Sequence, residues 1–297
     1  HDGNIFKEKL ICSSYIINGF GKSCGLIQIN ELGTLETPII FTNTLSVGTA
    51  STALIKYMLK NNKDIGITTG TINPVVCECN DGYLNDIRGL HVKEEHIFQA
   101  IENADIQFQE GNIGAGTGMS CYQLKGGIGS ASRIVNLDEK EYTIGAIVLS
   151  NFGLKKDLTI NGKKLGDKII SLENEEQLEK GSIIIILATD IPMNERQLKR
   201  ISKRVPVSLA RTGSHIGNGS GDIVIAFTTA NKINHYEEKD IITMKIINEN
   251  RIDTIFRAVI ETVEESIISS LLHSTSTTGR DGNTRESLNK YIDFILK

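Results

Sequence analysis

The sequence predicts an α/β fold in a single layered domain spanning residues 1–297, and three observations support this prediction. Short apolar runs of strand length recur along the chain, separated by glycine and asparagine turns. Segments with helical periodicity lie between these runs. Hydrophobic residues make up 39% of the chain and charged residues 23%, which is enough apolar material for a substantial core. Strands and helices mixed in this way are typical of stacked sheet and helix layers.

The first half of the chain is predicted to contain several strands and two helices. Strands are expected at three apolar runs, 10–17, 25–29 and 38–41, and a Thr-rich strand at 65–72. Helices are expected at 50–59 and 93–104. In each helix the apolar residues recur on one face. A glycine-dense segment, 111–129, follows the second helix.

The second half is predicted to contain three buried strands and three helices. The strands are expected at 142–149, 182–188 and 222–227, which are rich in β-branched and other apolar residues. The helices are expected at 194–203, 252–272 and 288–296. In the long helix the apolar residues repeat at spacings of three and four. Residues 211–221 are glycine-rich without periodicity and are expected to form a loop.

Composition argues against several classes of partner. The formal net charge is −4, and the one basic run, within 199–204, fits the wet face of a helix, so we expect no nucleic-acid partner. No stretch of about 18 apolar residues is present, so we expect no membrane span. Five cysteines are an odd count that favours free thiols and a cytoplasmic protein. Cys77 and Cys79 lack a second ligand pair at zinc spacing, so we expect no metal or other cofactor.

The glycine-dense segment resembles a nucleotide-binding loop at Gly114-Ala-Gly-Thr-Gly118. However, no strand precedes it and no lysine follows at the required position. Close packing of backbone against backbone is the simpler interpretation, because glycine permits short approaches and positive φ angles.

The second candidate site is the sequence Gly-Asn-Gly-Ser-Gly-Asp at 217–222. A serine in a glycine loop is usually only a turn. The nucleophile elbow does not fit, because that turn leads from a strand to a helix, whereas this one leads from a loop to a strand. A nucleophile whose base is its own α-amine, freed by cleavage of the chain, does fit. An α-amine titrates near pH 7.7–8.0 and can accept a proton without a histidine. Gly219 and Ser220 are therefore the candidate cleavage site, and Ser220 the candidate nucleophile.

At this point the motifs resemble those of one family along nearly the whole chain. The sequence resembles the DmpA-like family of L-aminopeptidase/D-esterases and β-peptidyl aminopeptidases. The motifs are NGFGK at 18–22, ELGTLETP at 31–38, TNTLSVG at 42–48, ECNDG at 78–82, LNDIR at 84–88, GAGTGM at 114–119, KGGIG at 125–129, ATD at 188–190, NGSGD at 218–222, AFTTAN at 226–231 and GRDG at 279–282.

The resemblance implies a four-layer αββα sandwich of the N-terminal-nucleophile hydrolase type. It also implies self-cleavage into pieces 1–219 and 220–297 and a homo-oligomer, typically a tetramer. The implied activity is release of N-terminal residues (L-α, D-α or β) from small peptides or amides through an acyl-enzyme on Ser220, without a metal. Family members carry more chain before the segment that matches residues 1–6.

The resemblance also implies further site residues. A Ser- or Thr-x-Glu element near the nucleophile corresponds to Thr262 and Glu264, which would act as catalytic residues by holding the Ser220 amine or the amino group of the substrate. Asn151 and Tyr122 are candidates for oxyanion and substrate contacts, and a purely structural hydrogen bond is the equal alternative for each. Residues two apart do not share a face of a regular helix. However, Thr262 and Glu265 fit a capping box, so the helix would have to begin or bend at Thr262 to turn it toward the site.

Two alternatives to the peptidase remain open from the sequence. One is an acyltransferase of the ornithine acetyltransferase type, which uses the same self-cleaving chemistry. The other is a non-catalytic small-molecule binder on the same fold, with an uncleaved chain.

Overall fold

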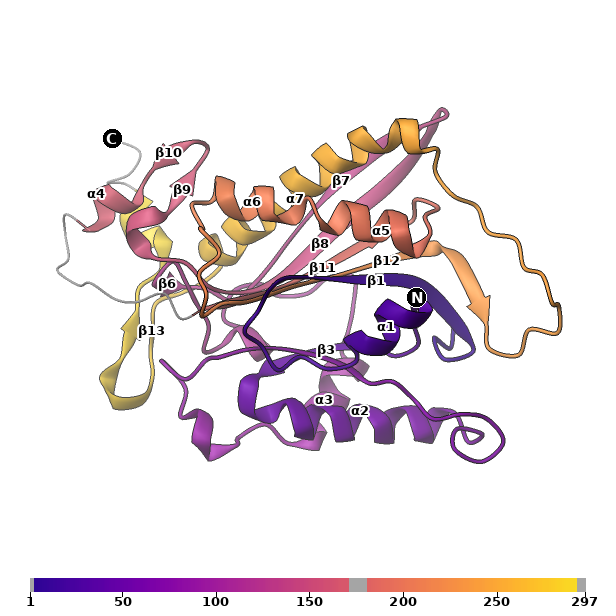
Figure 1. Ribbon diagram of the computed structural model, residues 1–297. Coiled ribbons are helices and arrows are strands. Elements are labelled where there is room, and N and C mark those ends of the chain that lie inside the picture. The colour runs from indigo at the N-terminus through magenta and orange to yellow at the C-terminus, as the bar shows by residue number, and fades with distance from the viewer. Residues whose placement is uncertain (1–2, 171–180, 293–297) are drawn as a thin grey trace.

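The computed structural model describes residues 3–170 and 181–292, and a six-stranded sheet forms its centre (Figure 1). The strand order is β2-β1-β12-β11-β8-β7. Only β11 and β12 pair in parallel; the other neighbours pair antiparallel. The bounds are β1 Glu8–Gly19, β2 Thr34–Leu35, β7 Ile128–Leu137, β8 Lys140–Asn151, β11 Ser182–Thr189 and β12 Gly221–Asn234.

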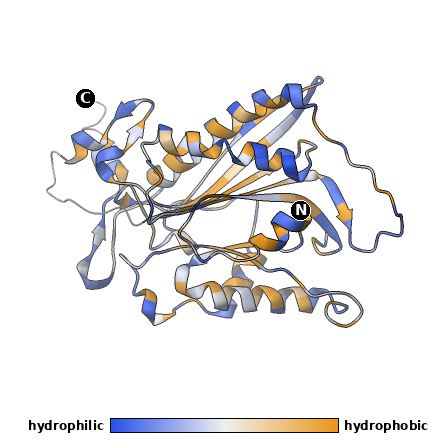
Figure 2. Cartoon of the chain, in the orientation of Figure 1, coloured by the Kyte–Doolittle hydropathy of each residue, from blue (hydrophilic) through white to orange (hydrophobic). Residues whose placement is uncertain are grey.

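Strand β12 lies at the middle of this sheet and is buried on both faces. Val224 and Ala226 belong to the apolar cluster on one face, whereas Ile223 and Ile225 belong to the cluster on the other. Successive side chains of a strand point to opposite faces, so a continuous apolar run fits a strand covered on both sides. Figure 2 shows the hydrophobic colour along the middle of this sheet.

Three helices cover one face of the six-stranded sheet: α5 Glu195–Ser202, α6 Val205–Arg211 and α7 Ile252–Leu272 (Figure 1). Helix α7 packs over β7 and β8. It approaches β7 so closely that a Cβ atom on Gly129 would lie 2.1 Å from the carbonyl oxygen of Ser266. Glycine at this position therefore sets how near the helix can lie to the sheet.

A second, smaller sheet and two helices cover the opposite face. Strands β3 Ile39–Asn43 and β4 Val75–Cys79 pair in parallel. Cys77 faces the six-stranded sheet, whereas Val76 packs in the cluster that includes residues of helix α2 Val47–Asn61. Helix α3 Glu94–Glu102 lies beside α2. The layers are thus helix, sheet, sheet, helix, and the predicted αββα sandwich is confirmed.

Shorter elements connect these layers. The remaining helices are α1 Leu26–Leu32 and α4 Gly166–Ile170. The remaining strands are β5 Ser120–Cys121, β6 Leu124–Lys125, β9 Thr159–Ile160, β10 Lys163–Lys164, β13 Thr277–Thr278 and β14 Thr284–Arg285. The 3₁₀ turns are η1 Thr44–Ser46, η2 Ile87–Gly89, η3 Gly114–Gly116, η4 Lys155–Asp157, η5 Glu249–Arg251, η6 Arg280–Gly282 and η7 Leu288–Tyr291. No helix in the described part of the chain is both long and apolar enough to cross a membrane.

Most of the predicted elements are confirmed, and the long helix has the same bounds as predicted, 252–272. The strand predicted at 25–29 is wrong, because this segment forms helix α1. Left-handed glycines, Gly25 and Gly33, flank that helix, and Leu26 and Ile29 share its buried face.

The strand predicted at 65–72 is also wrong. Its backbone folds into turns, in which Ile67 N and Thr68 N both donate to Asp64 O. The helix predicted at 288–296 begins as the 3₁₀ turn η7, and its end, from residue 293, lies outside the described residues. Strands β4 and β7 and helix α6 were not predicted.

The glycine-dense segment packs backbone against backbone, as its simpler interpretation predicts. A Cβ atom on Gly116 would lie 2.4 Å from Gly111 O, and one on Gly127 would lie 2.1 Å from the same oxygen. Glycine is required here because any larger residue would push the chains apart.

A fully buried lysine holds this segment together. The Lys125 ammonium donates hydrogen bonds to the carbonyl oxygens of Gly116 and Met119, both at 2.9 Å, and of Gly126 at 2.5 Å. Three acceptors match the three N–H bonds of an ammonium group. Burial lowers the pKa of Lys125 to about 7. The three carbonyl contacts therefore offset a large cost of removing this group from water.

Candidate active site

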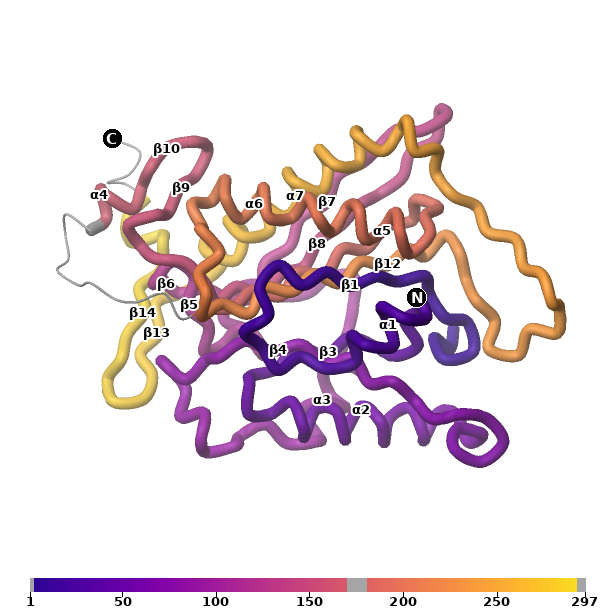
Figure 3. Tube along the Cα trace, viewed as in Figure 1, coloured from indigo at the N-terminus to yellow at the C-terminus, as the bar shows by residue number. Residues whose placement is uncertain are grey.

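Ser220 lies at the end of a tight turn, immediately before the central strand β12. Its backbone N–H donates to Gly217 O at 3.0 Å, and only 1% of the residue is exposed. Figure 3 shows the loop after α6 reaching the end of the sheet where β5 lies. The predicted loop at 211–221 is thus confirmed, and it places the serine at the end of the six-stranded sheet where the central strand β12 begins.

Asn18, near the end of β1, fixes this turn from the neighbouring strand. Its side-chain amide donates to the carbonyl oxygens of Gly217 and Asn218, both at 3.2 Å, and to that of Ser220. Asn18 pairs with Asp222 in the register of β1 and β12. Asn18 belongs to the NGFGK motif, but nothing local in the sequence indicates which distant strand it will face.

Asp222 is the group that contacts the serine hydroxyl. Ser220 Oγ donates to Asp222 Oδ1 at 2.6 Å, and each residue is 1% exposed. Asp222 is not among the site residues predicted from the sequence, although a local signal for it is present. Residues two apart on a strand point to the same face, so a serine and an aspartate at 220 and 222 are placed to meet.

Asn151 lies at the same end of the sheet as Ser220. It pairs with Ser182 on β11, and Ser182 pairs with Gly221 on β12. Two strand spacings of about 4.8 Å each put the Asn151 and Gly221 backbones roughly 10 Å apart. The Asn151 side chain accepts from Ser120 N at 2.8 Å and donates to Asn80 O at 3.0 Å. One of its two N–H donors is therefore used within the protein.

Tyr122 lies in the core rather than in an open site. It is fully buried, its hydroxyl donates to Thr212 Oγ1 at 2.8 Å, and its ring packs against Phe152. A Cβ atom on Gly153 would lie 2.6 Å from that ring, so the glycine makes room for it. Of the two interpretations, this geometry favours the structural hydrogen bond, which ties the turn between β5 and β6 to the start of the loop before Ser220.

Helix α7 runs without a kink through Thr262 and Glu264, so the bend considered from the sequence is absent. Thr262 is fully buried, and its hydroxyl has no hydrogen-bond partner among the described residues. Glu264 pairs with Arg211 at 3.1 Å. Within residues 3–170 and 181–292, no hydrogen bond or ion pair joins Ser220 to either residue. The structure therefore brings Asn151 to the end of the sheet that carries Ser220, and it leaves Thr262 inside the helix layer.

The five thiols are all free, and four of them are buried: Cys12, Cys77, Cys79 and Cys121. Burial raises the pKa of Cys77 and of Cys121 to about 12, and raises the pKa of Cys12 and Cys79 as well. Since the thiolate is the reactive form, these four thiols should be inert in the folded protein.

We predict that iodoacetamide near neutral pH labels only the half-buried Cys24 in the folded protein. In denaturant, all five thiols should react. The adducts are counted by intact mass, and the unfolded sample serves as the control. Rapid labelling of a second thiol without denaturant would contradict the burial described.

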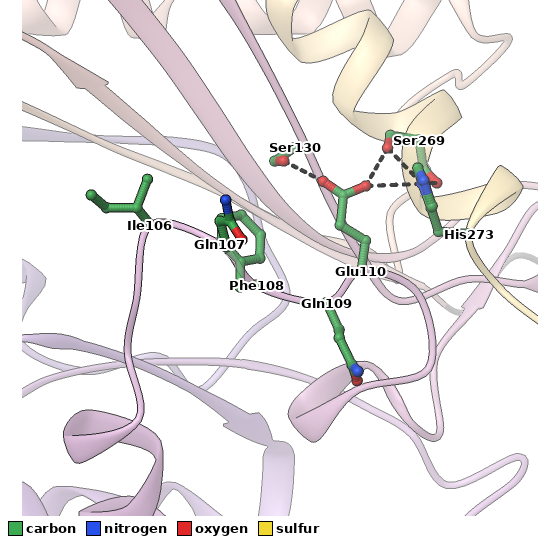
Figure 4. A pocket seen from close by; sticks show the side chains of 8 residues that line it. All are labelled: Ile106, Gln107, Phe108, Gln109, Glu110, Ser130, Ser269 and His273. Atoms are coloured by element: carbon green, nitrogen blue, oxygen red, sulfur yellow. Dashed lines mark hydrogen bonds and ion pairs between the residues drawn. The ribbon is translucent and has the colours of Figure 1, made fainter.

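A separate cleft of about 720 Å³ lies between β7, the end of α7 and residues 106–110. Figure 4 shows Glu110 at its wall, where Ser130, Ser269 and His273 surround the carboxylate. His273 Nδ1 lies 3.0 Å from Glu110 Oε2. None of the predicted site residues lines this cleft. In the described residues, no group of three or more His, Cys, Asp or Glu side chains is placed to hold a metal ion.

Comparison with known proteins identifies the family. Residues 1–285 match the sequence profile of peptidase family S58. The chain belongs to peptidase family S58. Among the relatives of this S58 peptidase, the β-peptidyl aminopeptidase BapA of Sphingosinicella microcystinivorans is 36% identical over 286 residues, which cover 91% of this chain and 71% of that protein.

Solved structures show the same fold. The structure of the PH0078 protein from Pyrococcus horikoshii OT3 matches with a TM-score of 0.95 at 53% sequence identity. The match covers 100% of this chain and 82% of the PH0078 chain. The L-aminopeptidase D-Ala-esterase/amidase from Ochrobactrum anthropi, a serine aminopeptidase with a variant of the Ntn hydrolase fold, has a TM-score of 0.90 at 33% identity, covering 97% and 81%. The S58 peptidase is therefore an aminopeptidase of the N-terminal-nucleophile hydrolase type.

Proposed function

We propose that Ser220 is the nucleophile of this aminopeptidase and that the chain first cleaves itself between Gly219 and Ser220. The observation that carries the proposal is the position of Ser220. It follows a tight turn, immediately precedes the central strand β12, and its hydroxyl donates to a carboxylate. Cleavage there would give the pieces 1–219 and 220–297. It would also free the Ser220 α-amine beside the hydroxyl that it must activate.

In the cleaved enzyme the α-amine takes the proton from Ser220 Oγ as the oxygen attacks the substrate carbonyl. The tetrahedral intermediate collapses, the bond to the leaving amine breaks, and that amine receives the proton. Water then hydrolyses the acyl-enzyme and restores the hydroxyl. An α-amine that titrates near pH 7.7–8.0 suits both directions of this transfer near neutral pH.

The proposed substrates are small peptides and amides with a free N-terminus. The relatives include β-peptidyl aminopeptidases and an L-aminopeptidase D-Ala-esterase/amidase, so the released residue is proposed from the L-α, D-α or β classes. Para-nitroanilides of one residue from each class would distinguish them. The acyltransferase and the non-catalytic binder gain no support from these relatives.

Glu264 enters the proposal as a positioning residue. Its carboxylate forms an ion pair with Arg211. The next residue, Thr212, accepts a hydrogen bond from the Tyr122 hydroxyl. The first contact joins helix α7 to the end of α6, and the second holds the residue after α6, where the loop toward Ser220 begins. Thr262 has no contact of this kind, and its place in the site rests on the family resemblance alone.

Asn151 is proposed as an oxyanion donor through the N–H that does not bind Asn80. Asn151→Ala should lower kcat about 10²–10³-fold, because one such donor is worth about 2.7–4 kcal/mol of barrier. KM should change little, since the oxyanion forms only in the transition state. Steady-state kinetics on an alanine anilide would measure both. A variant that unfolds more easily but keeps its kcat would show a structural role instead.

The intact mass of the purified chain under denaturing conditions tests the proposal. Two pieces that meet at Gly219 and Ser220 are the expected result. A single 297-residue chain with aminopeptidase activity would mean that another residue is the nucleophile. A single chain without activity would refute both the proposed self-cleavage and the proposed role of Ser220.

We further propose a homo-oligomer, as the family resemblance implies, in a cytoplasmic location. Several large apolar side chains lie exposed on the single chain, among them Ile27, Ile106 and Ile241. Their burial between subunits would be favourable. Light scattering on the cleaved protein would give the subunit number, and a monomer at micromolar concentration would refute this part.

A further inference from the structure

Self-cleavage needs a base that the mature enzyme does not need. In the continuous chain the Ser220 nitrogen is part of a peptide bond, and its N–H donates to Gly217 O at 3.0 Å. A peptide nitrogen is not basic, because its lone pair is delocalised into the carbonyl. The α-amine that would activate the mature nucleophile is therefore missing at the step that creates it.

The structure places one carboxylate on the hydroxyl that must react. Ser220 Oγ donates to Asp222 Oδ1 at 2.6 Å, within the range of about 2.5–2.7 Å for a hydroxyl bound to a charged oxygen. Both residues are 1% exposed, so bulk water does not compete for this contact. The carboxylate is thus aligned with the proton that must leave.

The surrounding backbone keeps the hydroxyl near the bond to be cut. The Asn18 amide holds three carbonyls of the 217–220 turn, those of Gly217, Asn218 and Ser220. Gly219, whose carbonyl carbon is the target, has no Cβ atom to block the approach. The turn therefore restricts the serine and its own preceding peptide bond to a small range of geometries.

We propose that Asp222 is the general base of self-cleavage and that the α-amine replaces it in this role after the cut. The inference rests on the proposed function of Ser220. The Asp222 carboxylate takes the proton from Oγ while the bond from Oγ to the Gly219 carbon forms. The bond from that carbon to the Ser220 nitrogen then breaks, and the nitrogen receives the proton. Water hydrolyses the resulting ester, which leaves a Gly219 carboxyl group, a free hydroxyl and a free amine.

The experiment compares two variants of the full chain, Asp222→Asn and Asp222→Glu. Each is made in a cell-free translation pulse, and the conversion of the 297-residue precursor into two pieces is followed by mass spectrometry. Asparagine keeps an oxygen that accepts the serine hydrogen bond but cannot take a proton at neutral pH. Glutamate keeps the base but moves it by one methylene. Far-UV circular dichroism of each purified variant checks its folding.

We expect Asp222→Asn to cleave about 10²–10⁴-fold more slowly than the unaltered chain, the range that a general base supplies. Asp222→Glu should cleave faster than Asp222→Asn. Asp190→Asn is the matched control. This carboxylate accepts from Thr143 N at 2.7 Å, next to the far end of β11, and its loss should leave the rate unchanged.

The order of the two variants decides the proposal. If Asp222→Asn cleaves within a few-fold of the unaltered chain, or faster than Asp222→Glu, then Asp222 only positions the serine and the inference is wrong. Either result leaves the proposed function intact, because the unaltered chain still divides at Ser220. An unaltered chain that never divides overturns both the inference and the proposed function.

Discussion

Ser220→Ala is expected to abolish self-cleavage and aminopeptidase turnover together. In the proposed mechanism the two reactions use the same oxygen as nucleophile, so no other group can replace it in either one. Removal of a nucleophile of this kind costs at least about 10⁴-fold in kcat, which would leave no measurable turnover. Denaturing mass spectrometry would show one chain of 297 residues, and an anilide assay would show no release.

A matched control is available in the same loop. Ser214 is also buried and accepts a hydrogen bond from Ile216 N at 3.1 Å, but it does not contact the proposed cleavage site. Ser214→Ala should therefore still cleave and turn over. A cleaved and active Ser220→Ala protein would refute the assignment of the nucleophile.

Lys125→Met is expected to cause the largest loss of stability. The substitution keeps most of the aliphatic volume but leaves the carbonyl oxygens of Gly116, Met119 and Gly126 without their buried donor. Each oxygen keeps one other donor, which is Met119 N for Gly116, Gly126 N for Met119 and Ser274 Oγ for Gly126. Each therefore loses one of two hydrogen bonds, at about 1 kcal/mol apiece, so the free energy of unfolding should fall by about 2–3 kcal/mol. This is a large share of the stability of a typical domain.

Urea unfolding followed by circular dichroism would measure this change, using the uncleaved Ser220→Ala chain as background so that one chain unfolds. Lys163→Met, on the exposed strand β10, is the control and should change stability by less than about 0.5 kcal/mol. Equal stabilities for the two variants would show that the lysine does not hold the glycine-dense segment.

The regular elements could be predicted because their apolar patterns are local. The period of 3.6 along 252–272 and the β-branched run at 222–227 each indicate an element without knowledge of its neighbours. Helix α1 could not be predicted in the same way. Its seven residues are short, and the left-handed glycines that bound it gain their meaning only from backbone angles. Strand β4, read as a cysteine motif, becomes a strand through its pairing with β3.

The candidate site also contains residues that a local pattern indicates and residues that only distant strand pairing brings together. The position of Ser220 before a strand could be read from the sequence, and the Ser-x-Asp spacing on that strand could also have been read. Asn18 could not, since 202 positions separate it from Ser220 and only the register of β1 with β12 joins them. For Thr262 and Glu264 the helix periodicity already indicated opposite faces, and the continuous helix α7 agrees with that periodicity.

The place of β12 in the sheet has a consequence for the life of the protein after the cut. β12 pairs with β1 on one side and β11 on the other. If the chain is cut as proposed, this strand of the smaller piece stays hydrogen-bonded between two strands of the larger piece. Correct folding must then precede the cut. Once divided and unfolded, the protein would face a bimolecular search, and its recovery would depend on concentration where that of the uncut chain does not. The mature enzyme would thus be stable for as long as it stays folded, but poorly able to form a second time.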